Sequence, residues 1–289
     1  MENSSFASTL ISWYQEHKRD LPWRDTRDPY KIWLSEIILQ QTRVAQGIPY
    51  YFSFLETYPT VLDLSQASEQ EVLRLWQGLG YYSRARNLHR CAKTIVDNYH
   101  GKFPATYQEL VKLPGIGDYT ASALASFAFL QPTPAVDGNV FRVLARIFGI
   151  TEDITKQKTR KVFRDLSYSL ISHHSPDTYN QGLMEFGAIQ CTPLAPKCDS
   201  CHFQSECVAF RTGKQQQLPV KSKRVKVRNR VFYYFVLKSD GGLLMKSRQS
   251  KDIWQGLYDF FLIEPSQKSD PYHLLSNNLP PGANLVQLR

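Results

Sequence analysis

Leu113-Pro114-Gly115-Ile116-Gly117-Asp118-Tyr119-Thr120-Ala121 is the stretch that decides the fold. Residues 107–112 predict a short helix before it, and residues 119–130 predict a longer apolar helix after it. The two glycines allow a turn with positive φ and the close approach of a ligand to the backbone. Unpaired N–H groups and the positive dipole end of the second helix face that turn, which favours an anion. A tight helical hairpin without a ligand is the alternative interpretation.

The composition indicates a globular protein with a polyanionic partner. The chain has 289 residues, a hydrophobic content of 42% and a formal net charge of +9. We therefore expect one large or two modest domains and a nucleic acid as the anion. No run approaches the ~20 apolar residues of a membrane span, and the first residues carry no secretion signal. These features predict no membrane association and a reducing, cytoplasmic setting.

Apolar periodicity predicts a mainly α-helical protein up to about residue 211. Residues 212–229 form a polar, basic stretch without helical periodicity, which we interpret as a linker, with a DNA clamp as the alternative. After it, residues 231–237, 243–246 and 256–262 predict strands, with a hairpin turn at 240–242. The first expected helix is capped by Ser4 or Ser5, and the others cover residues 29–42, 44–58, 69–77, 81–99, 107–112, 119–130, 139–148, 156–172 and 176–190.

Two acidic residues are candidates for chemistry. Glu36 interrupts a strongly apolar helix, and apolar surroundings raise the pKa of a carboxyl group so that it keeps a proton near neutral pH. Asp137 precedes a helix, where a cap or an Asx turn is the ordinary role of aspartate, just as a solvated helix rim is the ordinary place for Glu36. Together, one protonated and one ionised carboxyl group can break an N-glycosidic bond once the base has left the duplex.

Four of the five cysteines indicate a metal site. Cys191, Cys198, Cys201 and Cys207 have the spacing C-x6-C-x2-C-x5-C in one loop-rich segment. Four thiols this close in a reducing compartment are typical of a metal centre. Zinc and iron–sulfur both accept four cysteines, and His202 adds a possible zinc ligand, so the chemistry leaves both open.

The L-P-G-I-G-x-x-T-A pattern resembles the helix-hairpin-helix of the endonuclease III superfamily of DNA glycosylases. Members that also cleave the strand have a lysine directly before the Thr-Ala, but here Tyr119 stands there, and tyrosine cannot form a Schiff base. The resemblance therefore favours the branch that only removes the base, as MutY-type adenine DNA glycosylases do. Further stretches similar to that family are Leu21-Pro22-Trp23-Arg24, Ser35 to Thr42, Gly78 to Leu88, and Val136 to Val140.

The resemblance implies a two-lobed helix-hairpin-helix glycosylase fold over residues 1–211. One lobe would have six helices over about 22–130, and a cluster-bearing lobe would combine 1–21 with 131–211. It further implies that the cysteine spacing holds a 4Fe–4S cluster. Glu36 would be the general acid and Asp137 the partner of the oxocarbenium ion, supported by Tyr119 and Asn139. The implied DNA contacts are Trp23, Arg24 and Gln181 near the flipped adenine, Gln41, Thr42, Leu79 and Tyr81 at the opposite base and as a wedge, and Gly115 and Gly117 in the hairpin.

Residues 230–289 resemble the beginning of the Nudix-like C-terminal domain of that family, in a short and incomplete α/β form without a Nudix hydrolase box. The resemblance thus predicts a monomeric, bacterial-type, nucleoid-associated repair enzyme. Its substrate would be double-stranded DNA with an A:8-oxoguanine or A:G mispair. Two alternatives stay open, a bifunctional glycosylase and lyase like endonuclease III and a non-catalytic DNA-binding module.

Overall fold

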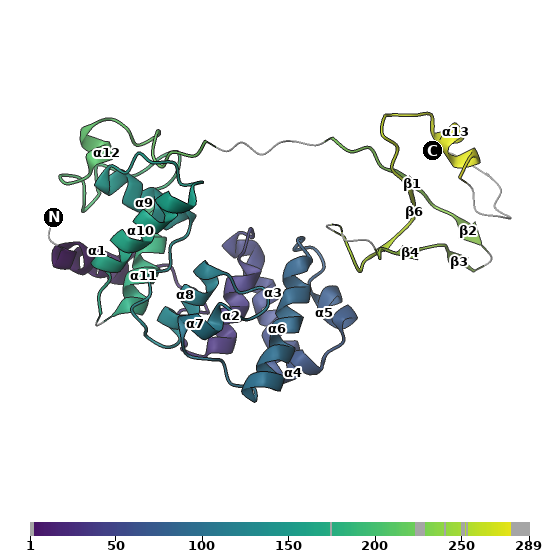
Figure 1. The fold of residues 1–289 in the computed structure, drawn as a ribbon, viewed down its shortest axis with the longest axis horizontal. Coiled ribbons are helices and arrows are strands. Elements are labelled where there is room, and N and C mark those ends of the chain that lie inside the picture. The colour runs from purple at the N-terminus through teal and green to yellow at the C-terminus, as the bar shows by residue number, and fades with distance from the viewer. Residues whose placement is uncertain are drawn as a thin grey trace. The chain divides into compact units, whose positions relative to one another are not determined.

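The computed structural model describes residues 3–173, 175–222, 229–239, 241–249, 252 and 254–278. The chain divides into two compact units, Met1–Lys223 and Arg224–Arg289. The first unit is built of helices, and the second has short strands and a helix (Figure 1). Within these described ranges, every helix is too short or too polar to cross a bilayer.

The helices of the first unit confirm the prediction of a mainly α-helical protein. Local signals set several of their starts: Asp28 caps the helix that begins at Pro29, and Thr60 and Ser68 form capping boxes at the helices that begin at Val61 and Glu69. The elements are α1 (Asn3–His17), α2 (Pro29–Ile38), α3 (Val44–Thr57), α4 (Val61–Gln66), α5 (Glu69–Leu75), α6 (Ser83–Tyr99), α7 (Tyr107–Leu110), α8 (Asp118–Phe127), α9 (Gly138–Phe148), α10 (Gln157–Leu170), α11 (Pro176–Glu185), a π-helix (Phe186–Gln190) and α12 (Val208–Arg211).

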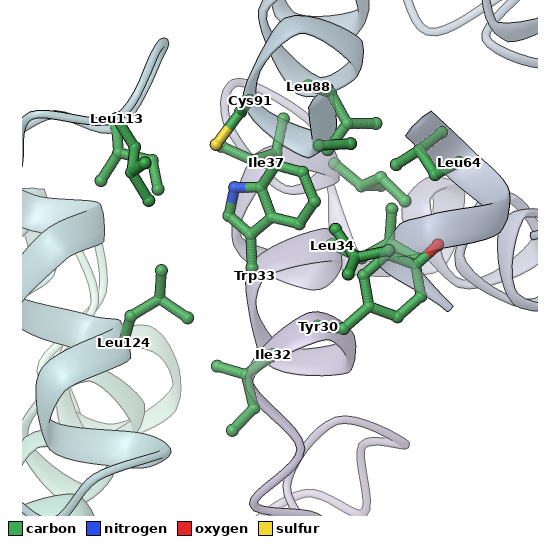
Figure 2. Close-up of a cluster of buried hydrophobic side chains, with 14 of the residues drawn as sticks. Tyr30, Ile32, Trp33, Leu34, Ile37, Leu64, Leu88, Cys91, Leu113 and Leu124 are labelled. Atoms are coloured by element: carbon green, nitrogen blue, oxygen red, sulfur yellow. The ribbon is translucent and has the colours of Figure 1, made fainter. Parts of the chain in front are cut away.

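One hydrophobic core is organised around α2. Trp33 is fully buried, and Figure 2 shows it beside Cys91 of α6; Leu113 of the hairpin and Leu124 of α8 belong to the same core. Burying each large apolar side chain stabilises the fold by roughly 1.5–3 kcal/mol. This core extends from Tyr30 to Ala135 in the sequence. It holds α2 and the hairpin together as one rigid support.

A second core joins the N-terminal helix to the distant part of the first unit. Phe6 of α1 stacks on Phe203 at 4.8 Å between ring centroids, and Trp13 meets Phe186 edge-on at 4.7 Å. Residues from α9, α10 and α11 complete this core. Helix α1 therefore packs against the helices that follow residue 137, as their neighbouring ribbons in Figure 1 show.

The hairpin between α7 and α8 needs glycine at one position. Gly115 has φ +75°, and a Cβ atom there would lie 2.6 Å from the Cβ atom of Asn87. Of the two glycines only Gly115 takes the positive φ, since Gly117 has φ −93° and precedes α8 as its N-cap. No atom lies within 4 Å of where a Gly117 Cβ would be, so its backbone is open to a ligand.

Several expected helix limits are wrong, and α2 is the informative case. It ends at Ile38 instead of Thr42, and Gln41 takes φ +57°. The Arg84 guanidinium accounts for this end, since it donates to the carbonyls of Ile37 (3.0 Å), Ile38 (2.8 Å) and Gln40. A side chain thus satisfies the carbonyls that a longer helix would have bonded.

The other differences at helix ends have local causes. Helix α1 starts at Asn3, so Ser4 and Ser5 lie inside the helix instead of preceding it. Helix α4 was missed because it is one short amphipathic segment between turns. The helix expected over 176–190 changes to π-helical bonding at Phe186, where the Cys191 N–H bonds the Phe186 carbonyl at 2.7 Å.

The second unit has three antiparallel pairs of short strands in its described residues. β1 (Tyr233–Phe235) pairs with β6 (Phe261–Ile263), β2 (Lys238–Ser239) with β3 (Gly242–Leu243), and β4 (Lys246–Ser247) with β5 (Tyr258–Asp259). Helix α13 (Pro271–Ser276) follows them. The three strands expected from the sequence are therefore only partly confirmed. Residues 231–237 contain the shorter strand β1, whereas residues 243–246 and 256–262 each contain parts of two strands with different partners. Asp240 of the expected turn lies outside the described residues.

Candidate active site

A cavity of about 580 Å³ lies where elements of the two cores meet, and its size is typical of a small-ligand site. Its wall combines α2 and α8 from the first core with α9 and α11 from the second. The sequence-predicted residues that line it are Trp23, Arg24, Glu36, Gln41, Thr42, Tyr119, Asp137, Asn139 and Gln181. The tertiary structure thus brings two carboxyl groups that are far apart in sequence to one hollow.

Glu36 reaches the cavity from the buried side of α2 and is only 9% exposed. Burial raises the pKa of its carboxyl group to about 7; a hydrogen bond with Tyr119 acts in the lower direction, and the negative charge of Asp137 adds to the rise. Glu36 therefore keeps a substantial protonated fraction near neutral pH.

Asp137 serves as the N-cap of α9 and lines the cavity at the same time. One carboxylate oxygen accepts from the Val140 backbone N–H at 2.8 Å, and the other accepts from the Asn139 side-chain amide at 2.9 Å. Burial raises the pKa of Asp137, while these hydrogen bonds act to lower it. The capping role and a chemical role are therefore compatible, since the N–H donors favour the ionised form.

Asn139 is held in place from behind. Its Oδ1 accepts from Arg142 at 2.7 Å, which leaves its NH₂ for Asp137. Arg142 in turn donates to the carbonyls of Cys191 (2.8 Å) and Gly187 (2.7 Å). A Cβ atom on Gly187 would lie 2.6 Å from the Cβ atom of Asn139, so glycine is required for this close approach.

Tyr119 enters the cavity from the first turn of α8. Burial foremost, and then the negative charges of Glu36 and Asp137, raise the pKa of its hydroxyl well above the usual value. The phenol therefore stays neutral and can donate a hydrogen bond. Its hydroxyl also lies 3.7 Å from the Met184 sulfur on α11.

A buried ion cluster that sequence reasoning missed forms another wall. Glu185 is 1% exposed and accepts hydrogen bonds from Arg19 (Nε, 2.7 Å) and Arg24 (Nη2, 2.7 Å). Burial alone would raise its pKa, but these hydrogen bonds lower the pKa of Glu185 to about 2. Tyr14 donates to Gln181 Oε1 at 2.7 Å, so the amide NH₂ of Gln181 is left as a donor. The available signal was a glutamate between the apolar residues Met184 and Phe186.

Four predicted DNA contacts do not line the cavity. Leu79 is buried in the first core, whereas Tyr81 is 64% exposed with φ +48°. Gly115 and Gly117 lie in the surface hairpin. Arg84, which sequence reasoning missed, donates to the carbonyls of Leu79 and Gly80 at 3.3 Å as well as to the end of α2. One buried guanidinium thus joins the turn of Gln41 and Thr42 to the loop of Leu79 and Tyr81.

The four cysteines of the predicted metal site line a separate, smaller pocket together with Arg146. Arg146 donates to the Cys191 sulfur at 3.4 Å and to the Thr192 carbonyl at 2.7 Å. In the described part of the chain, no three histidine, cysteine, aspartate or glutamate side chains form a group that could hold a metal as they stand. The donor set itself, four thiols in one apolar pocket beside a guanidinium, fits a cysteine-bound metal centre.

Comparisons with known proteins identify the family of the chain. Residues 34–167 match the model of the HhH-GPD superfamily base excision DNA repair protein. The chain is 35% identical over 256 residues to an adenine DNA glycosylase of Buchnera aphidicola from Schizaphis graminum, covering 88% of this chain and 74% of that protein. It is 43% identical over 226 residues to the adenine DNA glycosylase of Homo sapiens, covering 75% of this chain and 41% of that protein.

Solved structures show the same fold. A thermostable thymine-DNA glycosylase superimposes with a TM-score of 0.67 and 31% identity, covering 72% of this chain and 96% of that one. Endonuclease III in a non-covalent complex with DNA has a TM-score of 0.63 and 23% identity, covering 74% of this chain and 99% of that one. The expected helix-hairpin-helix glycosylase fold is confirmed. The chain belongs to the adenine DNA glycosylase family, within the helix-hairpin-helix superfamily of base excision DNA repair proteins.

Proposed function

We propose that this protein is a monofunctional DNA glycosylase that removes adenine mispaired with 8-oxoguanine or guanine. The observation that carries the proposal is the pair formed by Glu36 and Asp137 in one cavity. Burial raises the pKa of both carboxyl groups, to about 7 for Glu36, but Asp137 also accepts two N–H hydrogen bonds that favour its ionised form. Two carboxyl groups with different environments supply an acid and a charge stabiliser at one pH.

The reaction follows from these environments. The adenine first leaves the duplex stack and enters the cavity. Glu36 then donates its proton to the base while the bond between the base and C1′ breaks, and the electron pair of that bond goes to the base. Asp137 stabilises the positive charge that develops on the sugar. Water then adds to the sugar C1′, and its proton restores Glu36.

Tyr119 and Asn139 would position the two carboxyl groups. The neutral hydroxyl of Tyr119 hydrogen-bonds Glu36, and the amide of Asn139 hydrogen-bonds Asp137. Trp23, Arg24 and Gln181 would face the adenine, because they line the same cavity. Gln41 and Thr42 would meet the opposite base, with Leu79 and Tyr81 acting as the wedge. We propose the Gly115–Gly117 turn as the phosphate site, since an open N-cap glycine exposes the N–H groups of α8.

A bifunctional glycosylase and lyase is disfavoured by the cavity wall. Strand cleavage by that route needs an amine that forms a Schiff base with the sugar. Among the described residues that line the cavity, none is a lysine. We therefore expect base release without strand cleavage.

We also propose that Cys191, Cys198, Cys201 and Cys207 hold a 4Fe–4S cluster. Such a cluster, bound by four thiolates, would tie residues 191–207 into one rigid loop. The support is the shared pocket and the spacing of the cysteines. A brown protein with broad visible absorption would distinguish it from a zinc site.

The remaining proposals concern the second unit and the setting. We propose that residues 230–289 form part of a Nudix-like domain, supported by the antiparallel strand pairs followed by α13. Because one chain supplies the whole described cavity wall, we propose a monomer. A chromosomal DNA substrate suits a cytoplasmic, nucleoid-associated enzyme.

The decisive experiment is single-turnover base release from duplexes with adenine opposite 8-oxoguanine, guanine or thymine. Strand breaks are scored with and without alkali. We expect adenine release with breaks only after alkali, and loss of release in Glu36→Gln while DNA binding is kept. Glu56→Gln, a change of the same kind at an exposed position on α3, is the matched control. Breaks without alkali, or unchanged release by Glu36→Gln, would refute the proposal.

A further inference from the structure

A second surface hollow lies outside the cavity, between α10 and the start of α8. Four cations line it, together with two carboxylates and two neutral polar residues. We call its cationic part the α10 basic face, defined by Lys158, Arg160, Lys161 and Arg164. All four side chains are exposed. The proposed adenine-releasing chemistry uses none of them.

The α10 basic face is attached to the hairpin through Asp118, the first residue of α8. Arg164 Nη2 lies 3.6 Å from Asp118 Oδ2, and the Tyr107 hydroxyl of α7 donates to Asp118 Oδ1 at 2.9 Å. Asp118 directly follows Gly117, so its carboxylate lies beside the N–H groups that face the turn. Cations of α10 are therefore close to the place where the hairpin can bind a phosphate.

Packing fixes this arrangement. Phe163 of α10 meets Phe141 of α9 edge-on at 5.0 Å between ring centroids, and Phe163 is fully buried. This contact anchors the α10 backbone, from which the exposed cations extend, against α9.

The local ion pairs are weak enough to be exchanged for a stronger anion. Arg164 and Asp118 are 52% and 68% exposed, and the Lys161–Asp165 pair is 74% and 59% exposed. Exposed pairs of this kind contribute little to stability and are screened by salt. A polyanion with closely spaced charges can therefore compete with these carboxylates.

We propose that the α10 basic face binds the phosphate backbone of the same DNA duplex that the hairpin contacts. The inference rests on the proposed function, because that function makes duplex DNA the ligand. A strand carries one phosphate per 3.4 Å of helix axis, so more than one phosphate is within reach of side chains spaced three or four residues apart on α10. In this arrangement Asp118 opposes DNA binding, and Arg164 offsets its charge.

The test measures the salt dependence of duplex binding by the full-length chain. Fluorescence anisotropy gives the affinity for a duplex with an A:8-oxoguanine pair at several salt concentrations from about 50 to about 300 mM, over which the Debye length shortens steadily. Each variant is made in the Glu36→Gln background, so that the substrate is not consumed. The double variant Lys161→Ala/Arg164→Ala is expected to lower the slope of log K against log [salt] by about 1.8, or about 0.9 per lost phosphate contact.

The matched control is Arg90→Ala/Lys93→Ala, which removes the same charge from exposed positions on α6. It should leave the slope within about 0.3 of the parent value. Asp118→Asn should act in the opposite direction and tighten binding severalfold at low salt. An unchanged slope in the α10 double variant, or an equal loss in the α6 control, would overturn the inference.

Two further readouts keep the outcomes separate. Equal melting temperatures for parent and variants would show that the exposed substitutions leave the fold intact. Single-turnover adenine release, measured with Glu36 present and enzyme in excess, reports on the proposed function alone. Failure of that reaction, with the expected decrease in salt slope in the α10 double variant, would reject the glycosylase proposal and keep the DNA contact. Normal adenine release, with no change in salt slope in the α10 double variant, would keep the glycosylase proposal and reject the DNA contact of the α10 basic face.

Discussion

Replacing Glu36 with glutamine should stabilise the fold at alkaline pH while it abolishes base release. Burial raises the pKa of this carboxyl group from 4.5 to about 7 in the folded state. Between these values the folded protein binds a proton that the unfolded chain has lost, so the free energy of unfolding falls as pH rises. The stability contribution is therefore fully present below pH 4.5 and is lost as pH passes through about 7. At about 1.36 kcal/mol per pKa unit, the loss is up to about 3 kcal/mol.

The variant carries no charge at this position and should not show this loss. We expect the difference in free energy of unfolding, Glu36→Gln minus the parent protein, to rise by about 1–3 kcal/mol between pH 5 and pH 8. Urea unfolding followed by tryptophan fluorescence measures this difference, because Trp33 lies on α2, the helix that carries Glu36, and is buried in its core. Glu56→Gln should give a difference that does not change with pH. Parallel pH profiles for the parent and Glu36→Gln would refute the argument that Glu36 is held in an apolar site.

Four other outcomes test the remaining parts of the site. The single-turnover rate of base release should be level below pH 7 and fall about tenfold per pH unit above it, because the protonated form of Glu36 is the active one; a rate that rises between pH 7 and 9 would contradict this assignment. Glu185→Gln should destabilise the protein by about 3–5 kcal/mol, since two guanidinium groups lose a buried partner, and a change in melting temperature below 2 °C would refute the cluster's importance. Arg84→Lys keeps the charge but loses the guanidinium fork that joins two loops. Base release from 8-oxoguanine and guanine duplexes should then differ less between the two opposite bases, while the pH dependence of the rate stays unchanged. Cys198→Ser should remove the visible absorption of the purified protein, and a colour identical to that of the parent would argue against a cluster ligand at this position.

The resemblance to adenine DNA glycosylases was available from short local motifs. The hairpin stretch, the residues around Glu36 and the segment around Asp137 each carry their signal within a few positions, and the comparisons confirm the family. Helix positions were also largely predictable, because apolar periodicity and caps such as Asp28 act over one or two turns. Helix ends were less predictable, since α2 stops at a side chain from α6.

Sequence alone determined the type of fold, the two candidate carboxyl groups and the spacing of the four cysteines. Tertiary structure decided which groups meet. Arg84 reaches the end of α2 across 47 positions, and Glu185 binds Arg19 across 166 positions. The pKa of Glu36 likewise depends on the burial that neighbouring helices impose and not on its own helix. The physical reason is that helix formation and capping are local, whereas desolvation and ion pairing depend on contacts between segments far apart in the chain.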